Sequence, residues 1–296
     1  MKAALLPDRG VVKVAGDDAR KFLNGLITSD IAKVDPAHAA FAALLTPQGK
    51  IIADFILAEA EASDGGGYFL DSPRALAPTL VQRLNFYKLR AKVVVEDLSE
   101  VLGVMALWDG TRTSAYGLCY LDPRLPELGC RCMLPPHLAN EAAAELGAEL
   151  VDAAGYEAHR IALAVPRGGL DFVYGDAFPH ETDMDQLGGI DFAKGCFVGQ
   201  EVVSRIEHRG TARTRTVAVS FDDFAPEAGT PVSAGQKSVG TLGSTAQGRG
   251  VALLRLDRVA DALAAGERLT AGGIELRPHK PAWARFAFPG NAEAAR

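Results

Sequence analysis

The first residues of the chain carry apolar positions with strand-like and then helix-like spacing. A strand is predicted over residues 11–14, because three of these four residues are β-branched valines. Asp17 or Asp18 can then cap a helix. The apolar side of that helix would consist of Phe22, Leu23, Leu26 and Ile27. The chain is therefore expected to open as a strand followed by a helix.

Two apolar runs, 41–45 and 51–57, are joined by Thr-Pro-Gln-Gly-Lys at residues 46–50. This turn chemistry is typical of a β-hairpin with a slightly long loop, and we expect the hairpin at the edge of an antiparallel sheet. Residues 68–70 predict another strand. Ser72 and Pro73 then begin a predicted helix with one apolar side, formed by Leu76, Leu80, Leu84 and Tyr87.

The later part of the chain mixes strands and helices without the regular alternation of a parallel doubly wound sheet. We expect strands at 93–95, 101–108, 116–121 and 131–134, and a helix at 138–146. Beyond Arg213 the chain consists of short β-like runs, such as 216–221 and 250–256, separated by turns rich in proline and glycine. These patterns predict an α+β fold with a small all-β module at the C-terminal end.

The composition is that of a globular protein of 296 residues, 48% of them hydrophobic, with a net charge of −6. A chain of this size can bury the core of one large domain or of two. The negative charge argues against nucleic acid as a main partner, since phosphate binding needs a cationic surface. No apolar run approaches the roughly 20 residues that cross a bilayer. We therefore expect a soluble protein that binds neither nucleic acid nor membrane.

The four cysteines, at positions 119, 130, 132 and 196, lack the dense spacing of a disulfide framework. The N-terminal residues lack the apolar core of a secretory signal. Reduced thiols and a cytoplasmic location are therefore expected. Cys130-Arg131-Cys132 is not the two-residue-spaced pair of a zinc ribbon, and no histidine-rich segment accompanies it. We expect no resident metal ion.

The clearest candidate site is the octet Lys-Gly-Cys-Phe-Val-Gly-Gln-Glu at residues 194–201. Its central cysteine, Cys196, reacts as a thiolate, and the ammonium of Lys194 favours that charged form. Glycines at 195 and 199 let the main chain turn tightly or approach a ligand. A small buried residue in a corner fits the same composition. The remaining candidate residues of the octet are Gly195, Phe197, Gly199, Gln200 and Glu201.

Three segments taken together resemble the YgfZ family of folate-binding, iron–sulfur-related proteins. They are Phe-Leu-Asn-Gly-Leu-Ile-Thr-Ser-Asp at 22–30, the hairpin loop at 46–50, and the octet. Phe178-Pro179-His180-Glu181 and Leu187-Gly188-Gly189-Ile190 lead into the octet as in that family, and residues 205–210 follow it. The match runs across nearly the whole chain.

This resemblance implies a fold similar to the glycine cleavage T-protein. Residues 1–212 would form two intertwined α+β folate-binding subdomains, and residues 213–296 a C-terminal β-barrel. It also implies binding of tetrahydrofolate or a one-carbon derivative. The implied role is the assembly or repair of iron–sulfur proteins, including enzymes that modify transfer RNA, with iron–sulfur client or assembly proteins as partners and a transient contact with a cluster.

Folate presents a pterin edge with N–H donors, which suits a carboxylate, and a glutamate tail, which suits arginine. By resemblance Glu181 would bind the pterin, while Arg205, Arg209 and Arg213 could meet the tail and Asn24 a ligand amide. The residues alone favour a loop carboxylate, solvated surface charges and a local cap. The nearby acids Asp183 and Asp185 are interpreted as turn residues.

Three functions stay open from the sequence. The first is a folate-dependent maintenance factor for iron–sulfur proteins, an accessory factor more than an enzyme, with Cys196 as the active thiol and Lys194 beside it. The second is a folate-dependent aminomethyltransferase or demethylating enzyme, which needs a carboxylate near the folate nitrogen. The stretch after Asp71 continues Ser-Pro-Arg-Ala-Leu-Ala-Pro without an acid, so Asp71 itself or a shifted alignment would have to supply it. The third is a folate-binding scaffold in which the cysteine does not matter.

Overall fold

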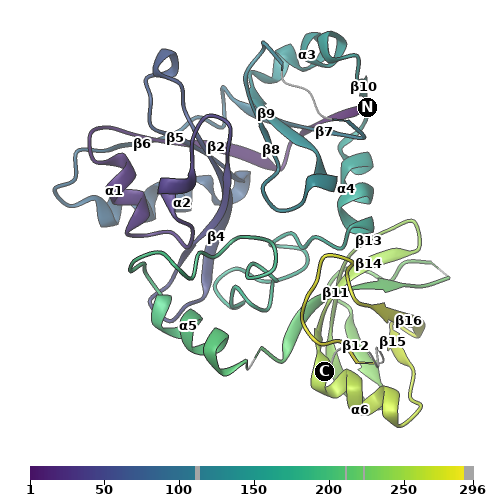
Figure 1. Cartoon of the computed structure of the whole chain (residues 1–296). Coiled ribbons are helices and arrows are strands. Elements are labelled where there is room, and N and C mark those ends of the chain that lie inside the picture. Colours follow the sequence, from purple (N-terminus) through teal and green to yellow (C-terminus); the bar gives the residue numbers. More distant parts are fainter. Residues whose placement is uncertain (111–113, 211, 223, 290–296) are drawn as a thin grey trace. The chain divides into compact units, whose positions relative to one another are not determined.

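The computed structural model describes residues 1–110, 114–210, 212–222 and 224–289 (Figure 1). The chain divides into two compact units. Unit 1 consists of Met1–Tyr156 and Leu187–Gln200, and unit 2 of Glu157–Gln186 and Glu201–Arg296. No helix in the described ranges is long and apolar enough to cross a bilayer.

The first sheet of unit 1 carries the expected hairpin at its edge. Its strand order is β3 (Ala40–Leu45), β4 (Ile51–Glu59), β5 (Tyr68–Pro73), β2 (Arg9–Ala15) and β6 (Val94–Asp97), and all neighbours are antiparallel. Helices α1 (Ala19–Asn24) and α2 (Ala77–Lys88) accompany the sheet. They share one buried apolar cluster with the strands, to which Leu23, Leu80 and Leu84 contribute.

The second sheet of unit 1 is built largely from the middle of the chain. Its order is β10 (Glu149–Leu150), β1 (Lys2–Leu6), β7 (Gly103–Trp108), β9 (Cys130–Leu134) and β8 (Leu118–Leu121). Helix α3 (Ala139–Leu146) joins the apolar cluster of this sheet through Ala142 and Leu146. Strand β1 was not predicted.

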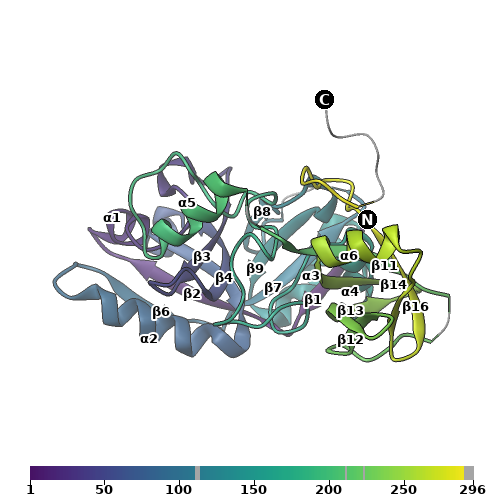
Figure 2. The same ribbon diagram turned by 90° about the horizontal axis from the view of Figure 1, so that it is seen from below.

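Unit 2 contains a closed barrel. Its strand order is β11 (Thr214–Ser220), β14 (Arg249–Arg255), β13 (Lys237–Ala246), β12 (Pro231–Ala234), β15 (Leu269–Ala271) and β16 (Ile274–His279). Helix α6 (Leu256–Ala264) contributes Leu256, Val259 and Ala262 to the barrel's apolar cluster, and Figure 2 shows it against the strands. The predicted all-β module is therefore present. Its predicted start, residue 213, immediately precedes β11.

Several local predictions differ from the structure. The helix expected from Ser72 begins only at Ala77, because residues up to Pro73 continue the ladder between β5 and β2. Helices α4 (Ala153–Ala162), α5 (Gln200–Arg209) and α6 were not predicted. In α5 only Val203 is fully buried, and its apolar side consists of no more than Val202, Val203 and Ile206, a short signal that the sequence analysis did not use.

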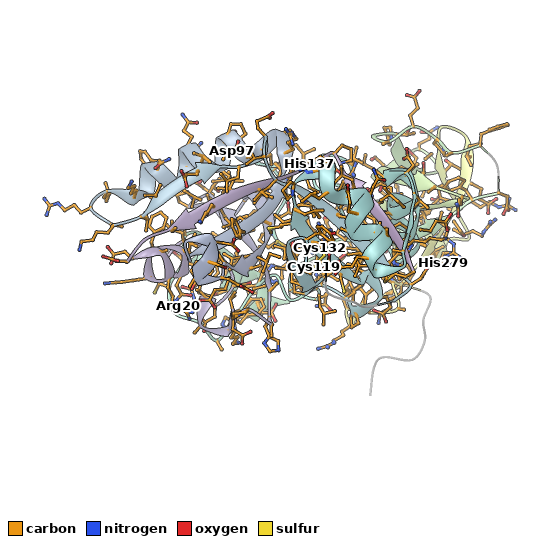
Figure 3. All side chains as sticks on the ribbon, turned by 90° about the horizontal axis from the view of Figure 1, so that it is seen from above. Arg20, Asp97, Cys119, Cys132, His137 and His279 are labelled. Carbon is orange, nitrogen blue, oxygen red and sulfur yellow. A yellow bond between two sulfur atoms is a disulfide. The ribbon has the colours of Figure 1, made fainter. Side chains whose placement is uncertain are left out.

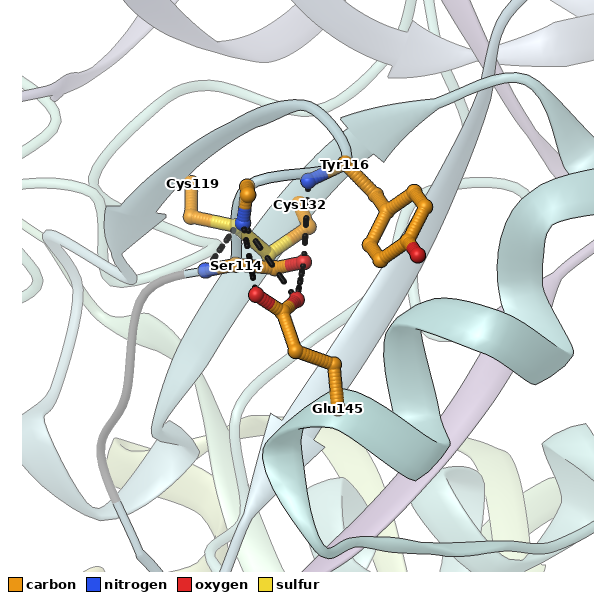
Figure 4. Close-up of a disulfide and its surroundings, with 6 residues drawn as sticks. Ser114, Tyr116, Cys119, Cys132 and Glu145 are labelled. Carbon is orange, nitrogen blue, oxygen red and sulfur yellow. Dashed lines mark hydrogen bonds between the residues drawn. A yellow bond between two sulfur atoms is a disulfide. The ribbon is translucent and has the colours of Figure 1, made fainter.

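The expectation of reduced thiols is wrong for one pair. Cys119 and Cys132 form a disulfide across β8 and β9 (Figures 3 and 4). They are direct partners in the strand register, with Cα atoms 4.0 Å apart. A sequence separation of 13 residues does not reveal this pairing, because only the strand register places the two side chains opposite each other. Cys130 and Cys196 are free cysteines.

Candidate functional site

The octet is held in unit 1 by a buried ammonium group. Lys194 Nζ donates hydrogen bonds to the main-chain oxygens of Asn24 (2.8 Å), Ile27 (2.6 Å) and Ser29 (3.0 Å) at the end of α1. These three bonds use all three N–H groups of an ammonium. Burial lowers the pKa of Lys194 to about 8. Lys194 therefore anchors the octet to a segment about 170 residues earlier in the chain.

The segment before the octet is tied to the same place. The hydroxyl of Thr28 donates to the carbonyl of Gly189 (2.5 Å), and the amide of Asp191 donates to the carbonyl of Thr28 (3.0 Å). The carboxylate of Asp191 also forms an ion pair with Lys33. The loop that enters the octet is thus fixed to the residues following α1.

The end of the octet packs on the β3–β4 hairpin loop. Gly199 has a φ of +82°, and a Cβ atom there would lie 2.6 Å from the carbonyl oxygen of Thr46 and 3.1 Å from the Cα of Gly49. Only glycine fits both the conformation and the contact. The three segments that carried the family resemblance, 22–30, 46–50 and the octet, therefore meet at one place in unit 1.

We expect Gly199→Ala to destabilise the protein by about 2–4 kcal/mol, since it combines a left-handed backbone with a collision against the main chain. Urea denaturation measures the change. Gly195→Ala is the matched control, because nothing lies within 4 Å of its Cβ position. Equal stability of the two variants would contradict the packing described here.

Cys196 lies between two anchors and faces solvent. Its side chain is a free, exposed thiol, whereas Lys194 and Phe197 on either side are buried. The ammonium lies 5.3 Å from the centre of the Phe197 ring. A buried packing role for Cys196 is therefore wrong. The structure presents this thiol to whatever approaches the loop.

The last two residues of the octet begin α5. Gln200, half-buried, begins α5. Glu201 is exposed and forms an ion pair with Arg205 (2.6 Å) on the same helix. The predicted influence of Lys194 on the thiolate stays a prediction, because the described contacts of its ammonium are those with the α1 end.

Unit 2 contains a cavity of about 570 Å³, here called the larger cavity, whose lining includes both basic and acidic side chains. Its walls include two arginines, Arg213 and Arg215, together with His180, Glu207, Phe286 and Phe288. The guanidinium of Arg215 lies 5.0 Å from the centre of the Phe286 ring. Its Nε is buried and has no hydrogen-bond acceptor among the described residues. A buried donor without an acceptor is costly, which makes this wall suited to an anionic or carbonyl-bearing ligand.

Arg215 is held by the loop that precedes the octet. It donates to both oxygens of Asp185 (2.6 and 3.0 Å), to the carbonyl of His180 (2.7 Å) and to Asp183 (3.2 Å). The imidazole of His180 lies 3.0 Å from the carboxylate of Glu207 on α5. Asp183 and Asp185 thus belong to a buried charged network, which their interpretation as turn residues missed.

His180, Asp185 and Glu207 offer ligand atoms within 4.8 Å of one another. Both oxygens of Asp185 are nevertheless occupied by the guanidinium of Arg215. A metal ion bound there would share its carboxylate ligand with this cation. We interpret the group as a salt-bridged network and assign no metal to it.

Asp183 is the most perturbed carboxyl group of this network. It is fully buried, with a φ of +57°, and accepts a hydrogen bond from the hydroxyl of Thr216. Burial raises its pKa from the ordinary 3.8 to about 8. Thr216 and Arg215 lower this pKa and Asp185 raises it further, but burial is the largest effect.

Asp183 should make the folded state less stable as the pH rises from about 4 to 8. Over this window the unfolded chain releases the proton while the folded chain keeps it, which costs up to about 1.4 kcal/mol per pH unit. Asp183→Asn should remove this loss. Urea denaturation between pH 4.5 and 7.5 measures it, with exposed Asp109→Asn, also at positive φ (58°), as control. Parallel curves for wild type and Asp183→Asn would contradict the assignment.

Glu181 lines a neighbouring cavity of about 330 Å³, here called the smaller cavity, together with Arg213. One oxygen of its carboxylate accepts the amide hydrogen of Phe178 (2.8 Å). Arg205 and Arg209 are exposed on α5 and are not among the residues that line these two cavities. Of the arginines considered from the sequence, Arg213 lies in the cavity walls, and Arg215 was missed.

Asn24 caps local structure in unit 1. Its side-chain oxygen accepts the amide hydrogen of Ile31 (3.0 Å). A role of Asn24, Arg205 or Arg209 toward folate stays a prediction.

Asp71, the carboxylate considered for aminomethyl transfer, is fully buried in unit 1. Arg9 and Arg131 each donate to it at 2.6 Å, and the hydroxyl of Tyr120 donates at 3.1 Å. Burial alone would raise its pKa, but the two arginines outweigh burial and lower it. A carboxylate held in this way has no free side for a substrate amine.

Comparisons with known proteins place these features in context. A family model described as "CAF17, C-terminal beta-barrel domain" matches residues 213–286. The mitochondrial iron-sulfur cluster assembly factor IBA57 homolog of Mycosarcoma maydis is 36% identical over 74% of this chain and 57% of its own length. The human mitochondrial iron-sulfur cluster assembly factor IBA57 is 30% identical over 86% of this chain and 77% of its own length.

Among solved structures, the glycine cleavage system aminomethyltransferase T from Bartonella henselae superposes with a TM-score of 0.73 over 96% of this chain and 86% of that one, at 15% identity. Such a likeness shows the fold alone. The predicted T-protein-like α+β fold with a C-terminal barrel is confirmed.

The chain spans little more than half the length of three fungal relatives, namely 57%, 58% and 54%. These relatives and the human protein are mitochondrial. The expected cytoplasmic location is therefore wrong. Sparse cysteines and the lack of a secretory signal do not distinguish the two compartments, which is why the sequence argument failed.

Proposed function

We propose a function from the premise that this chain belongs to the family of iron-sulfur cluster assembly factor IBA57: it serves the assembly or repair of iron–sulfur proteins, and Cys196 is its reactive group. The single observation that carries the proposal is the exposed thiol between two buried anchors. Thiolates are the usual protein ligands of iron–sulfur clusters. A lone thiol cannot close a cluster site, so the cluster is cargo that a partner shares.

The chemistry asked of Cys196 is simple. The thiol loses its proton to solvent, and the thiolate sulfur forms a bond to an iron atom that a partner brings, replacing a weaker ligand there. The anchors at Lys194 and Gly199 hold the main chain on both sides of the thiol. Because the loop is already fixed, it loses little conformational entropy when a partner binds.

The resemblance to the YgfZ family extends the proposal to clients. It favours enzymes that modify transfer RNA and contain an iron–sulfur cluster. In this reading the chain is an accessory factor, and its partners are iron–sulfur clients or assembly proteins.

A cell that lacks this chain should retain the client polypeptide but lose the activity of the iron–sulfur enzyme. Plasmid-borne wild-type protein should restore it. Client activity, client abundance and cluster absorbance are measured in parallel. Normal cluster content in the deletion strain would contradict the proposal.

We also propose that unit 2 binds tetrahydrofolate. The residues fit the group: Arg215 carries a buried donor without an acceptor among the described residues, Phe286 and Phe288 provide aromatic walls, and Glu181 lines the smaller cavity. Arg213 and Arg215 suit the carboxylates of the tail and Glu181 the N–H edge of the pterin. When bound, a reduced folate supplies nitrogen atoms that carry a one-carbon unit.

Glu181→Gln should weaken tetrahydrofolate binding by about tenfold or more, because a charge-assisted hydrogen bond to the pterin is lost. Titration calorimetry with purified protein measures the Kd. Exposed Glu141→Gln serves as the control for loss of charge. An unchanged Kd for Glu181→Gln would remove this residue from the folate site.

Aminomethyl transfer is not proposed for this chain. Its fold is shared with an aminomethyltransferase, but the carboxylate at Asp71 is occupied by two arginines and a tyrosine.

A further inference from the structure

The connection between α2 and β6 in unit 1 exposes large apolar side chains. Phe86, on the last turn of α2, is 72% exposed, and Leu89, which follows the helix, is 91% exposed. Val94, the first residue of β6, is 54% exposed. We call residues 83–94 the α2–β6 tip. Figure 2 shows it as an outlying loop beyond the end of α2.

The backbone of the tip is strained at the most exposed of these residues. Leu89 has a φ of +43°, a conformation that residues with a side chain rarely adopt. The strained backbone presents a leucine to solvent, so neither the strain nor the exposure is offset by packing within unit 1. Strain of this kind is concentrated at functional positions.

The tip is also cationic in a chain of net charge −6. No acidic residue occurs between Ser72 and Val95, whereas the tip carries Arg83, Lys88, Arg90 and Lys92. Lys92 faces Asp17 at 3.6 Å. The other three cations form no ion pair with any residue that the structure describes. The tip thus carries exposed apolar side chains and three cations unpaired among the described residues in one short segment, while Asp17 and Asp18 contact Lys92.

We propose that the α2–β6 tip docks a protein partner with an acidic, apolar-centred surface, in which Phe86 and Leu89 are the anchors and Arg83, Lys88 and Arg90 the charged rim. Aromatic anchors within a charged rim are the usual anatomy of a binding hot spot. The positive charge of the rim raises the association rate with an acidic partner and disfavours binding of basic ones.

Two other occupants fit the tip less well. Membrane binding by a basic segment takes about four to eight basic residues; the tip has three free ones, and the net charge of the chain opposes an anionic surface. A symmetric contact with a second copy would place the cations of one tip against those of the other. The net charge of the chain opposes an acidic protein partner as well, but such a partner needs only the local rim of three cations and avoids the like-charge contact of a symmetric dimer. The proposal does not depend on the reaction of Cys196.

The test begins with a photo-crosslink in living cells. Phe86 is replaced by p-benzoylphenylalanine in the full chain, and adducts are identified by mass spectrometry. Phe224 is the matched control position, because it is 95% exposed but neighbours Asp222 rather than basic residues. We expect an adduct with an acidic peptide of one protein at position 86 and not at 224.

The crosslinked protein is then purified and titrated against the wild-type chain and two variants, Arg83→Glu/Lys88→Glu/Arg90→Glu and Phe86→Ser/Leu89→Ser. Both variants should bind at least about tenfold more weakly, and added salt should weaken only the wild-type and serine complexes strongly. Thermal unfolding checks that both variants are folded.

Several results would overturn the proposal. They are adducts only with phospholipid, adducts with a second copy of this chain, the same adducts from positions 86 and 224, no adduct at all, or a partner whose affinity neither variant changes. A Cys196 variant could lose client activity and still bind the partner through the tip. That result would leave the tip proposal intact, so the two proposals can be tested separately.

Discussion

A Cys196→Ala protein is expected to fold as stably as the wild type and yet to leave an iron–sulfur client enzyme without activity. The side chain is exposed, and substitutions at such positions change stability by about 0.5 kcal/mol at most. Alanine cannot bind iron, so a function that requires the sulfur is lost entirely. The measurement is the activity of an iron–sulfur enzyme that modifies transfer RNA, in a deletion strain carrying the variant.

Two controls separate loss of the sulfur from damage to the loop. Gly195→Ala changes the neighbouring residue, whose Cβ position is open, and should retain activity. Tetrahydrofolate binding by Cys196→Ala should equal that of the wild type. Full client activity with Cys196→Ala would exclude the thiol mechanism and favour a folate-binding scaffold without chemistry of its own.

Lys194→Met is expected to destabilise unit 1 by about 2–5 kcal/mol. Methionine fills a similar volume but donates no hydrogen bond, so the carbonyls of Asn24, Ile27 and Ser29 lose their shared donor. A buried polar group left without its partner costs about 1–3 kcal/mol, and the three losses add only in part. Urea denaturation with separate probes in the two units measures the change.

Lys33→Met is the matched control for this substitution. Lys33 is largely exposed, and its ion pair with Asp191 lies at the surface, where such pairs contribute about 0–1 kcal/mol. Client activity should fall with Lys194→Met, because the loop that presents Cys196 is released. If Lys194→Met were as stable as Lys33→Met, the buried ammonium would not anchor the octet.

Local sequence patterns were sufficient to predict many of the strands and helices. The hairpin at 46–50, strand β2 and the barrel strands β11 and β14 follow from short apolar runs between turn residues, whose preferences act over a few positions. Helix α5 was not predicted, because its apolar signal is limited to Val202, Val203 and Ile206 in a strongly polar segment. The strand that continued to Pro73 was missed because its pairing with β2, about 60 residues away, outweighed the local preference for a helix start.

The candidate site was also predicted only in part, because some of its residues come together through contacts between distant segments. The octet stands out by its residue types, and the exposure of Cys196 agrees with the functional interpretation. Arg215 was missed, because only the packing of β11 against the loop at 180–185 brings it to a cavity wall. The alternation of β11 does place Arg215 on the face of the buried Val217 and Val219, but not beside a cavity.

The sequence by itself determined the α+β class and the β-rich C-terminal module and singled out the octet as a candidate site, because these depend on residue types and short spacings. Only the tertiary structure decided that Lys194 caps the end of α1, that Asp183 is a buried acid, and that Cys119 pairs with Cys132. Each of these depends on which groups are buried together by segments that lie far apart in the chain. Burial of a group is decided by the complete fold, whereas residue spacing can be read from the sequence.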